Sequence, residues 1–162
     1  MVYIFKDSKD KADKDEIIFM EQFAKRFPEG TEWRDTGRQE DQYESKDKVV
    51  TFPDGTELYL QLKHDEKSIV TGNLFLELLS DKERCTKGCI ESCKVENMLY
   101  YNLEANEIYW FTQEKLWNFI KTEGHRYQCR DVKNRGYTTH GMIVSKQDLI
   151  PVMEGQRIRK II

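Results

Sequence analysis

The sequence predicts an α/β fold in which helices flank a central mixed sheet. Apolar runs with helical spacing alternate with β-prone runs, in the order helix, hairpin, strand, helix, strand, helix. That order is typical of a sheet with helices on both sides. The length of 162 residues and the hydrophobic content of 38% suit one domain with a sizeable core. We therefore expect a single domain over residues 1–162.

The first helix is expected over about residues 14–27. Ile17, Ile18, Met20, Phe23, Ala24 and Phe27 recur at helical spacing, and Pro28-Glu29-Gly30 ends the run. The following residues 29–46 are strongly polar and are predicted to form a loop.

Residues 47–63 are predicted to form a hairpin around Pro53-Asp54-Gly55. This sequence favours a type I turn closed by a glycine in the left-handed conformation. Phe52 then faces Thr56, and counting outward places Asp47 opposite Gln61, with Lys63 on the same face. The other face is apolar and carries Val50, Phe52, Leu58, Leu60 and Leu62.

The later elements follow from local patterns. Strands are expected over residues 73–79, 107–111 and 137–145, and helices over residues 91–103, from Thr112 to before Gly124, and from Ser145 through Ile150. Glu77 on a central strand needs a partner if it is buried, so it is expected to be either a structural carboxylate or one that supports the residues of the metal site. The tail from Arg157 to Ile162 suits an edge strand or an interaction arm.

Asp47, Gln61 and Lys63 form a polar set that suits a metal-dependent phosphodiesterase. A carboxylate and a neighbouring oxygen ligand can hold Mg²⁺ with waters retained. The lysine can orient or help to deprotonate the attacking water and offset charge on the phosphate. The alternative is an ordinary hairpin with a polar solvent face, because alternation alone produces many of those.

An Asp followed by (Asp/Glu)-x-Lys on the paired strand resembles the PD-(D/E)xK nuclease superfamily, which has the restriction-endonuclease-like fold. The resemblance extends over residues ~43–110, through Lys63-His64-Asp65, Thr71-Gly72-Asn73, Glu77 and Lys87-Gly88, and is closest to small phage and bacterial members. This chain departs from the motif at Gln61, where Glu or Asp is usual. Gln still offers an oxygen but no negative charge, and some restriction enzymes also carry Gln there.

The resemblance implies a Mg²⁺-dependent DNA endonuclease, with Mn²⁺ as a substitute. Asp47 and Gln61 are the implied metal ligands, and Lys63 is the residue that acts on the water. Related nucleases often add a Glu from the first helix, which makes Glu21 a candidate ligand, although a surface glutamate is the alternative. Small nucleases of this fold often form homodimers, but nothing in the sequence fixes an interface.

Two further groups of side chains are candidates. Asp65 shares the face of Lys63 and is the next acid near the expected metal. The segment 125–135 is short of apolar residues and is predicted to be a loop; it is either a charged surface loop or a phosphate-contacting one. Its candidate nucleic-acid contacts are Arg126, Arg130, Lys133 and Arg135.

Cysteine usage and hydropathy indicate the compartment. Four cysteines without a secretory signal fit a reducing environment, and no run reaches the ~18 apolar residues of a membrane span. We expect an intracellular, cytoplasmic protein with no membrane partner, in the host cytoplasm if it is a phage protein. Cys85, Cys89 and Cys93, with Cys129 downstream, do not match the usual zinc spacing, so we expect no stoichiometric zinc or iron.

The leading hypothesis is therefore a metal-dependent deoxyribonuclease. The net charge of −3 argues against broad coating of nucleic acid but allows local phosphate contacts. One alternative is an inactive nucleic-acid-binding or assembly module on the same scaffold. Another is a protein-interaction domain in which Asp47 and Lys63 form a plain salt bridge.

Overall fold

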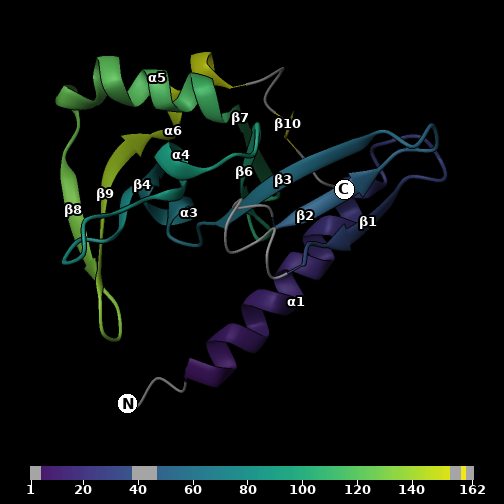
Figure 1. Cartoon of the computed structure of the whole chain (residues 1–162), viewed down its shortest axis with the longest axis horizontal. Coiled ribbons are helices and arrows are strands. Elements are labelled where there is room, and N and C mark those ends of the chain that lie inside the picture. Colours follow the sequence, from purple (N-terminus) through teal and green to yellow (C-terminus); the bar gives the residue numbers. More distant parts are fainter. Residues whose placement is uncertain (1–4, 38–46, 154–157, 160–162) are drawn as a thin grey trace.

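The computed structural model describes residues 5–37, 47–153 and 158–159, and it is a mixed α/β structure with two sheets. Sheet A has the strand order β1-β2-β3-β6-β7-β10, and sheet B has the order β5-β4-β9-β8 (Figure 1). The strands of sheet A are β1 (Glu32–Asp35), β2 (Lys48–Thr51), β3 (Glu57–His64), β6 (Asn97–Asn102), β7 (Glu107–Thr112) and β10 (Ile158–Arg159). Those of sheet B are β4 (Asn73–Asp81), β5 (Thr86–Lys87), β8 (Cys129–Lys133) and β9 (Thr138–Ser145).

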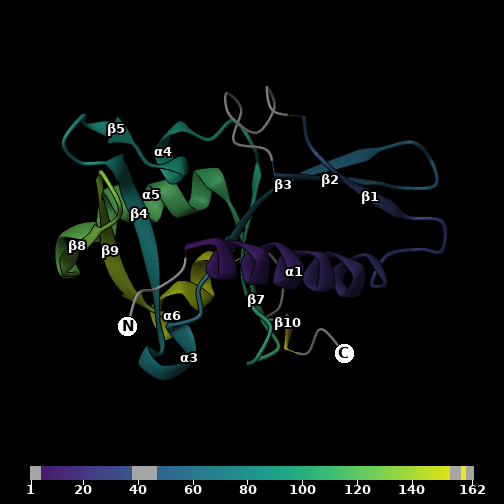
Figure 2. The same ribbon diagram turned by 90° about the horizontal axis from the view of Figure 1, so that it is seen from below.

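Two long helices lie on different sides of the sheets, as Figures 1 and 2 show. They are α1 (Phe5–Ala24) and α5 (Gln113–Glu123). Three single-turn helices connect strands: α3 (Ser68–Thr71), α4 (Cys89–Ser92) and α6 (Lys146–Leu149). Short 3₁₀ turns cover Gly124–Arg126 and Ile150–Val152.

The predicted hairpin is confirmed. The N–H of Phe52 donates to Thr56 O at 2.9 Å, the N–H of Gly55 donates to Phe52 O at 2.9 Å, and Gly55 has a φ of 84°. The register pairs Lys48 with Leu60 and Thr51 with Glu57, as counting outward from the turn requires. The turn residues were therefore sufficient to predict which side chains of the hairpin share a face.

Sheet A is mixed, as predicted, because β3 pairs in parallel with β6 whereas its other pairings are antiparallel. One face packs on α1, with a core formed by Phe19, Met20, Phe23, Val50, Leu60, Leu62, Leu99, Tyr101 and Ile108. The other face packs on α4, α5 and sheet B, through residues that include Leu76, Ile90, Met98, Phe111 and Val144. The expected mixed sheet with helices on both sides is therefore present, but the sequence did not predict the second sheet, which joins α4 and α5 on the second face.

The predicted helix over residues 91–103 was wrong, because the chain forms strand β6 there. Leu99 and Tyr101 belong to the core under α1, whereas Met98 and Tyr100 belong to the core toward sheet B. A strand buried on both faces is a continuous apolar run, so it lacks the period of two that marks a half-buried strand.

Two predicted loops contain edge strands instead. Strand β1 pairs with β2 and contributes Trp33 to the core under α1, while all five residues of β8 are exposed. Neither strand has an apolar repeat, so periodicity could not detect them. Helix α1 also begins earlier than expected, at Phe5. By contrast, β4, β7, α5, β9 and α6 lie close to their predicted ranges, and Thr112 and Ser145 cap α5 and α6 as expected.

Lys48 connects α1 to sheet A and provides a test of this packing. Its side chain is 7% exposed and forms ion pairs with Glu16 of α1 and Asp35 of β1. Burial lowers the pKa of Lys48, but hydrogen bonds from it to Asp35 and Glu16 raise it, and the net direction is upward. Both ion pairs therefore persist at neutral pH, and the contribution that depends on the lysine charge is lost as the pH rises through the raised lysine pKa.

We expect Lys48→Met to lower the free energy of unfolding by about 1–3 kcal/mol, less than for a fully buried pair because both carboxylates are partly exposed. The measurement is urea denaturation at pH 7. Lys82→Met is the matched control, since Lys82 forms an ion pair with Asp131 at 2.6 Å but is 47% exposed. A denaturation midpoint of Lys48→Met equal to that of wild type would show that the ion pairs of Lys48 contribute no stability.

Candidate functional site

Asp47 and Gln61 are in direct contact, as the predicted register requires. Asp47 immediately precedes β2, and its Oδ2 accepts hydrogen bonds from Gln61 Nε2 at 2.6 Å and from the N–H of Leu62 at 2.8 Å. The main chain of Asp47 also donates to Leu60 O at 2.9 Å. The carboxylate is thus fixed at the end of the β2–β3 ladder.

Gln61 is buried and acts in this structure as a donor to Asp47. Carboxylate, carboxamide and main-chain oxygens are ligands that Mg²⁺ accepts while it keeps several waters, so the donor chemistry fits this ion. Because the amide presents its nitrogen to Asp47, metal binding through Gln61 requires the amide to turn. Asp47 and Gln61 together carry one negative charge, whereas the PD-(D/E)xK motif usually has two carboxylates at these positions.

Lys63 is partly buried and lies among groups from three other segments. It lies beside the Cys89 side chain of α4 and interacts electrostatically with Glu77 of β4 and with Asp47. Burial lowers the pKa of Lys63, but Cys89, Glu77 and Asp47 raise it, and the net direction is upward. Burial raises the pKa of the Cys89 thiol, which therefore stays neutral at pH 7. Lys63 is thus a cation at neutral pH and is suited to stabilise negative charge rather than to accept a proton.

Lys63 opens onto a pocket of about 630 Å³ between the two sheets. The polar side chains around it include Lys63, Asp65, Glu77, Tyr100, Arg130 and Lys133. Tyr100 is the parallel partner of Lys63 on β6, and its hydroxyl is buried without a hydrogen-bond partner among the described residues. The pocket therefore combines a lysine and a carboxylate on its inner side with cations from β8.

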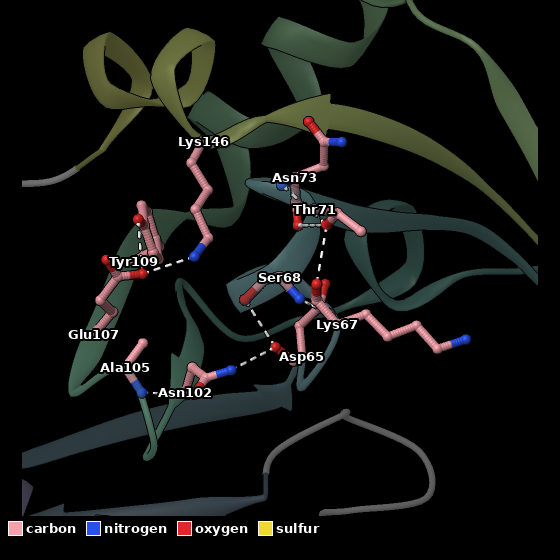
Figure 3. Close-up of polar contacts among 10 residues, drawn as sticks. All are labelled: Asp65, Lys67, Ser68, Thr71, Asn73, Asn102, Ala105, Glu107, Tyr109 and Lys146. Atoms are coloured by element: carbon pink, nitrogen blue, oxygen red, sulfur yellow. Dashed lines mark hydrogen bonds and ion pairs between the residues drawn. The ribbon is translucent and has the colours of Figure 1, made fainter.

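Asp65 anchors the segment between β3 and β4 that lines this pocket, and Figure 3 draws its contacts with Ser68 and Asn102. Its Oδ1 accepts from the N–H of Ser68 at 3.1 Å, its Oδ2 accepts from the N–H of Phe75 at 3.1 Å, and its main-chain oxygen accepts from Asn102 Nδ2 at 2.9 Å. Both carboxylate oxygens already bind main-chain donors. The structure thus favours a positioning role for Asp65 over the predicted role of metal ligand.

Glu21 does not join this group of side chains. It is exposed on α1 and lines a separate depression with Phe27 and Trp33. The helix carboxylate that approaches sheet A is instead Glu16, which pairs with Lys48. Helical spacing could not distinguish the two, because the choice depends on how α1 is rotated against the sheet.

The four predicted nucleic-acid contacts separate into two groups. Arg130 and Lys133 on β8 line the pocket, whereas Arg126 pairs with Glu123 at 2.7 Å and Arg135 lies in the exposed β8–β9 turn. The sequence predicted a basic segment here but did not predict that part of it forms strand β8. Arg130 and Lys133 lie at the pocket because consecutive residues of β8 line it, whereas Arg126 and Arg135 lie outside this strand.

Sequence analysis did not predict that Tyr100 lines the pocket, because its segment was predicted to be a helix. Glu77 was expected to be either a structural carboxylate or one that supports the site, and its place beside Lys63, which fits the second alternative, depends on sheet B lying against sheet A. Cys85 and Cys129 are exposed and Cys89 and Cys93 are buried. In the described part of the chain, the one group with metal-binding spacing is Asp15, His64 and Glu66, on the α1 side of sheet A.

Comparisons with models of protein families, with curated proteins and with solved structures found no match. Among the described helices, none has the length and apolar character that crossing a membrane requires.

Proposed function

We propose that the protein is a metal-dependent DNA endonuclease that hydrolyses phosphodiester bonds on a restriction-endonuclease-like scaffold. The observation that carries this proposal is the position of Lys63, a partly buried cation beside Asp47 and Gln61 that opens onto a pocket with further cations. A phosphodiester needs positive charge where negative charge develops in the transition state, and a partly buried lysine supplies it strongly.

In the proposed reaction, the Asp47 carboxylate and the Gln61 amide oxygen would hold Mg²⁺ or Mn²⁺. When bound, the cation lowers the pKa of a coordinated water and offsets charge on the phosphate. Lys63 orients the phosphate and stabilises its added charge, and Glu77 and Asp47 keep Lys63 protonated. Arg130 and Lys133 bind neighbouring phosphates of the strand.

A second candidate is a nucleic-acid-binding or assembly module without catalysis. The observation that favours it is the hydrogen bond from Gln61 to Asp47, which leaves one carboxylate where the motif usually has two. In that case, the same cations would bind DNA, but a metal ion would not lead to cleavage.

The test is DNA cleavage by wild type and Asp47→Asn with Mg²⁺, with Mn²⁺ and with EDTA. We expect metal-dependent cleavage that EDTA abolishes and that Asp47→Asn lowers by at least ~10²-fold, since the variant loses the ligand charge and keeps the shape. Wild type that binds DNA in a salt-sensitive manner and cuts it under no metal condition would establish the binding module instead.

A further inference from the structure

We propose that the pocket beside Lys63 binds one unpaired nucleotide of a DNA strand, so that the substrate is single-stranded or branched DNA rather than continuous duplex. This inference rests on the proposed function, because it names the substrate of the same site.

The size and position of the pocket carry the first step. A pocket of about 630 Å³ is of the order that buries a small ligand or one nucleotide. Lys63 lines this pocket together with side chains from both sheets. A base that enters such a pocket must come from a single strand or from a nucleotide extruded from the duplex.

The charges at the rim carry the second step. Lys67, Arg130 and Lys133 line the pocket, and none of them forms an ion pair with a described carboxylate. The carboxylate of Asp131 is already bound, by Lys82 at 2.6 Å and by His140 at 2.6 Å. Asp65 is bound by main-chain N–H groups. The groups left for a ligand at the rim are therefore cations, which suit phosphates.

The inner side of the pocket carries the third step. Tyr100 is 2% exposed, and its hydroxyl has no partner within the described chain. Burial, together with Cys89, Glu77 and Asp65, raises the pKa of Tyr100, so the hydroxyl remains a donor. This hydroxyl has almost no accessible surface, so the polar groups that a ligand meets on the inner side of the pocket are Lys63 and Glu77, both of which are partly exposed.

The apolar part of the wall suits a base. Phe75, Val132 and Ile143 line the same pocket as the cations. Aromatic and apolar side chains stack on bases with little regard to sequence, as in proteins that bind single strands through a basic groove. The pocket thus has contacts for a phosphate and for a base, and neither contact requires a second strand.

The experiment measures binding in EDTA, where no cleavage occurs. A labelled single-stranded oligonucleotide is competed with circular single-stranded DNA, with relaxed closed-circular duplex and with free dAMP. We expect the circular single strand to compete at least about tenfold better than the duplex, a difference of about 1.4 kcal/mol, and dAMP to compete weakly. Equal competition by the closed duplex, or displacement by dAMP at the same concentration as by the strand, would overturn the assignment.

Three variants connect this binding to the pocket. Arg130→Gln/Lys133→Gln should weaken single-strand binding about tenfold or more and lower its salt slope by about 0.7 for each cation removed. The matched control is Lys121→Gln/Arg126→Gln, which removes one lysine and one arginine from the α5 region outside the pocket. An equal loss in both double variants would refute a role of the pocket. Tyr100→Phe should leave both single-strand binding and the denaturation midpoint unchanged, because the hydroxyl is buried away from a ligand and has no partner among the described residues.

The two proposals fail in different ways. Wild type that binds single strands through the pocket but cuts nothing in any metal refutes the nuclease function alone. Wild type that cuts closed duplex as fast as single strands, with the pocket variants unaffected, refutes the nucleotide pocket alone.

Discussion

Lys63→Met is expected to lower the rate of metal-dependent DNA cleavage by ~10²–10⁴-fold, the range found for electrostatic and acid–base groups. Methionine has a similar length and no charge, so the variant removes the cation with little change in packing. Since a cation is not a metal ligand, the apparent affinity for Mn²⁺ should change little. The measurement is single-turnover cleavage across a Mg²⁺ and Mn²⁺ titration.

The matched control is Lys67→Met, which removes a second lysine that lines the same pocket but lies outside the Asp47–Gln61 contact. It should weaken DNA binding and leave the single-turnover rate at saturating DNA almost unchanged. The raised pKa of Lys63 adds a further expectation, because a lysine that stays protonated imposes no rise in rate between pH 6 and about 9. Lys63→Met protein that cuts at the wild-type rate would place the active site elsewhere.

Gln61→Glu is expected to tighten Mn²⁺ binding by about tenfold, since a carboxylate binds a hard cation better than an amide. The substitution places a second carboxylate where Gln61 Nε2 now lies 2.6 Å from Asp47 Oδ2. Without metal, the two like charges repel and one carboxylate stays protonated at a raised pKa. The variant should therefore be less stable than wild type in EDTA and should regain that stability when metal is added.

Calorimetric titration with Mn²⁺, and denaturation midpoints with and without EDTA, measure both effects. Gln147→Glu is the control, because Gln147 is exposed on α6 and remote from Asp47. If Gln61→Glu leaves the Mn²⁺ affinity unchanged, the Asp47–Gln61 pair is not the metal site, and the binding-module alternative gains support.

The part of the site that sequence could predict is the part fixed by local rules. Turn residues at 53–55 set the hairpin register, and the register brought Asp47 to Gln61. The pocket could not be predicted in this way, because Glu77, Tyr100 and Arg130 come from strands that meet Lys63 only through tertiary packing. Two of those strands, β6 and β8, were also misassigned, since one is buried on both faces and the other is exposed along its whole length.

The same limit applies to the polar face of the hairpin, where local rules predicted which residues share the face but not how far they are buried. Alternation correctly placed Gln61 opposite the apolar residues of the α1 side, and the alternative to a metal site was a polar face toward solvent. In the structure this face carries Gln61 at 6% exposure and the fully buried Val49. Periodicity gives the side of a strand on which a residue lies, whereas burial depends on what packs there, and here that is a second layer of structure.

The hydrogen bonds of Asp65 have a consequence for how the two walls of the pocket respond to a ligand. One carboxylate ties Ser68 and Phe75 to the end of β3, so amide hydrogens on that wall should exchange slowly with solvent. The opposite wall is β8, an edge strand with five exposed residues, whose amides should exchange through small local openings. If a DNA strand binds in the pocket as proposed, we expect β8 to adjust more than the wall that Asp65 anchors and to lose more conformational entropy on ordering.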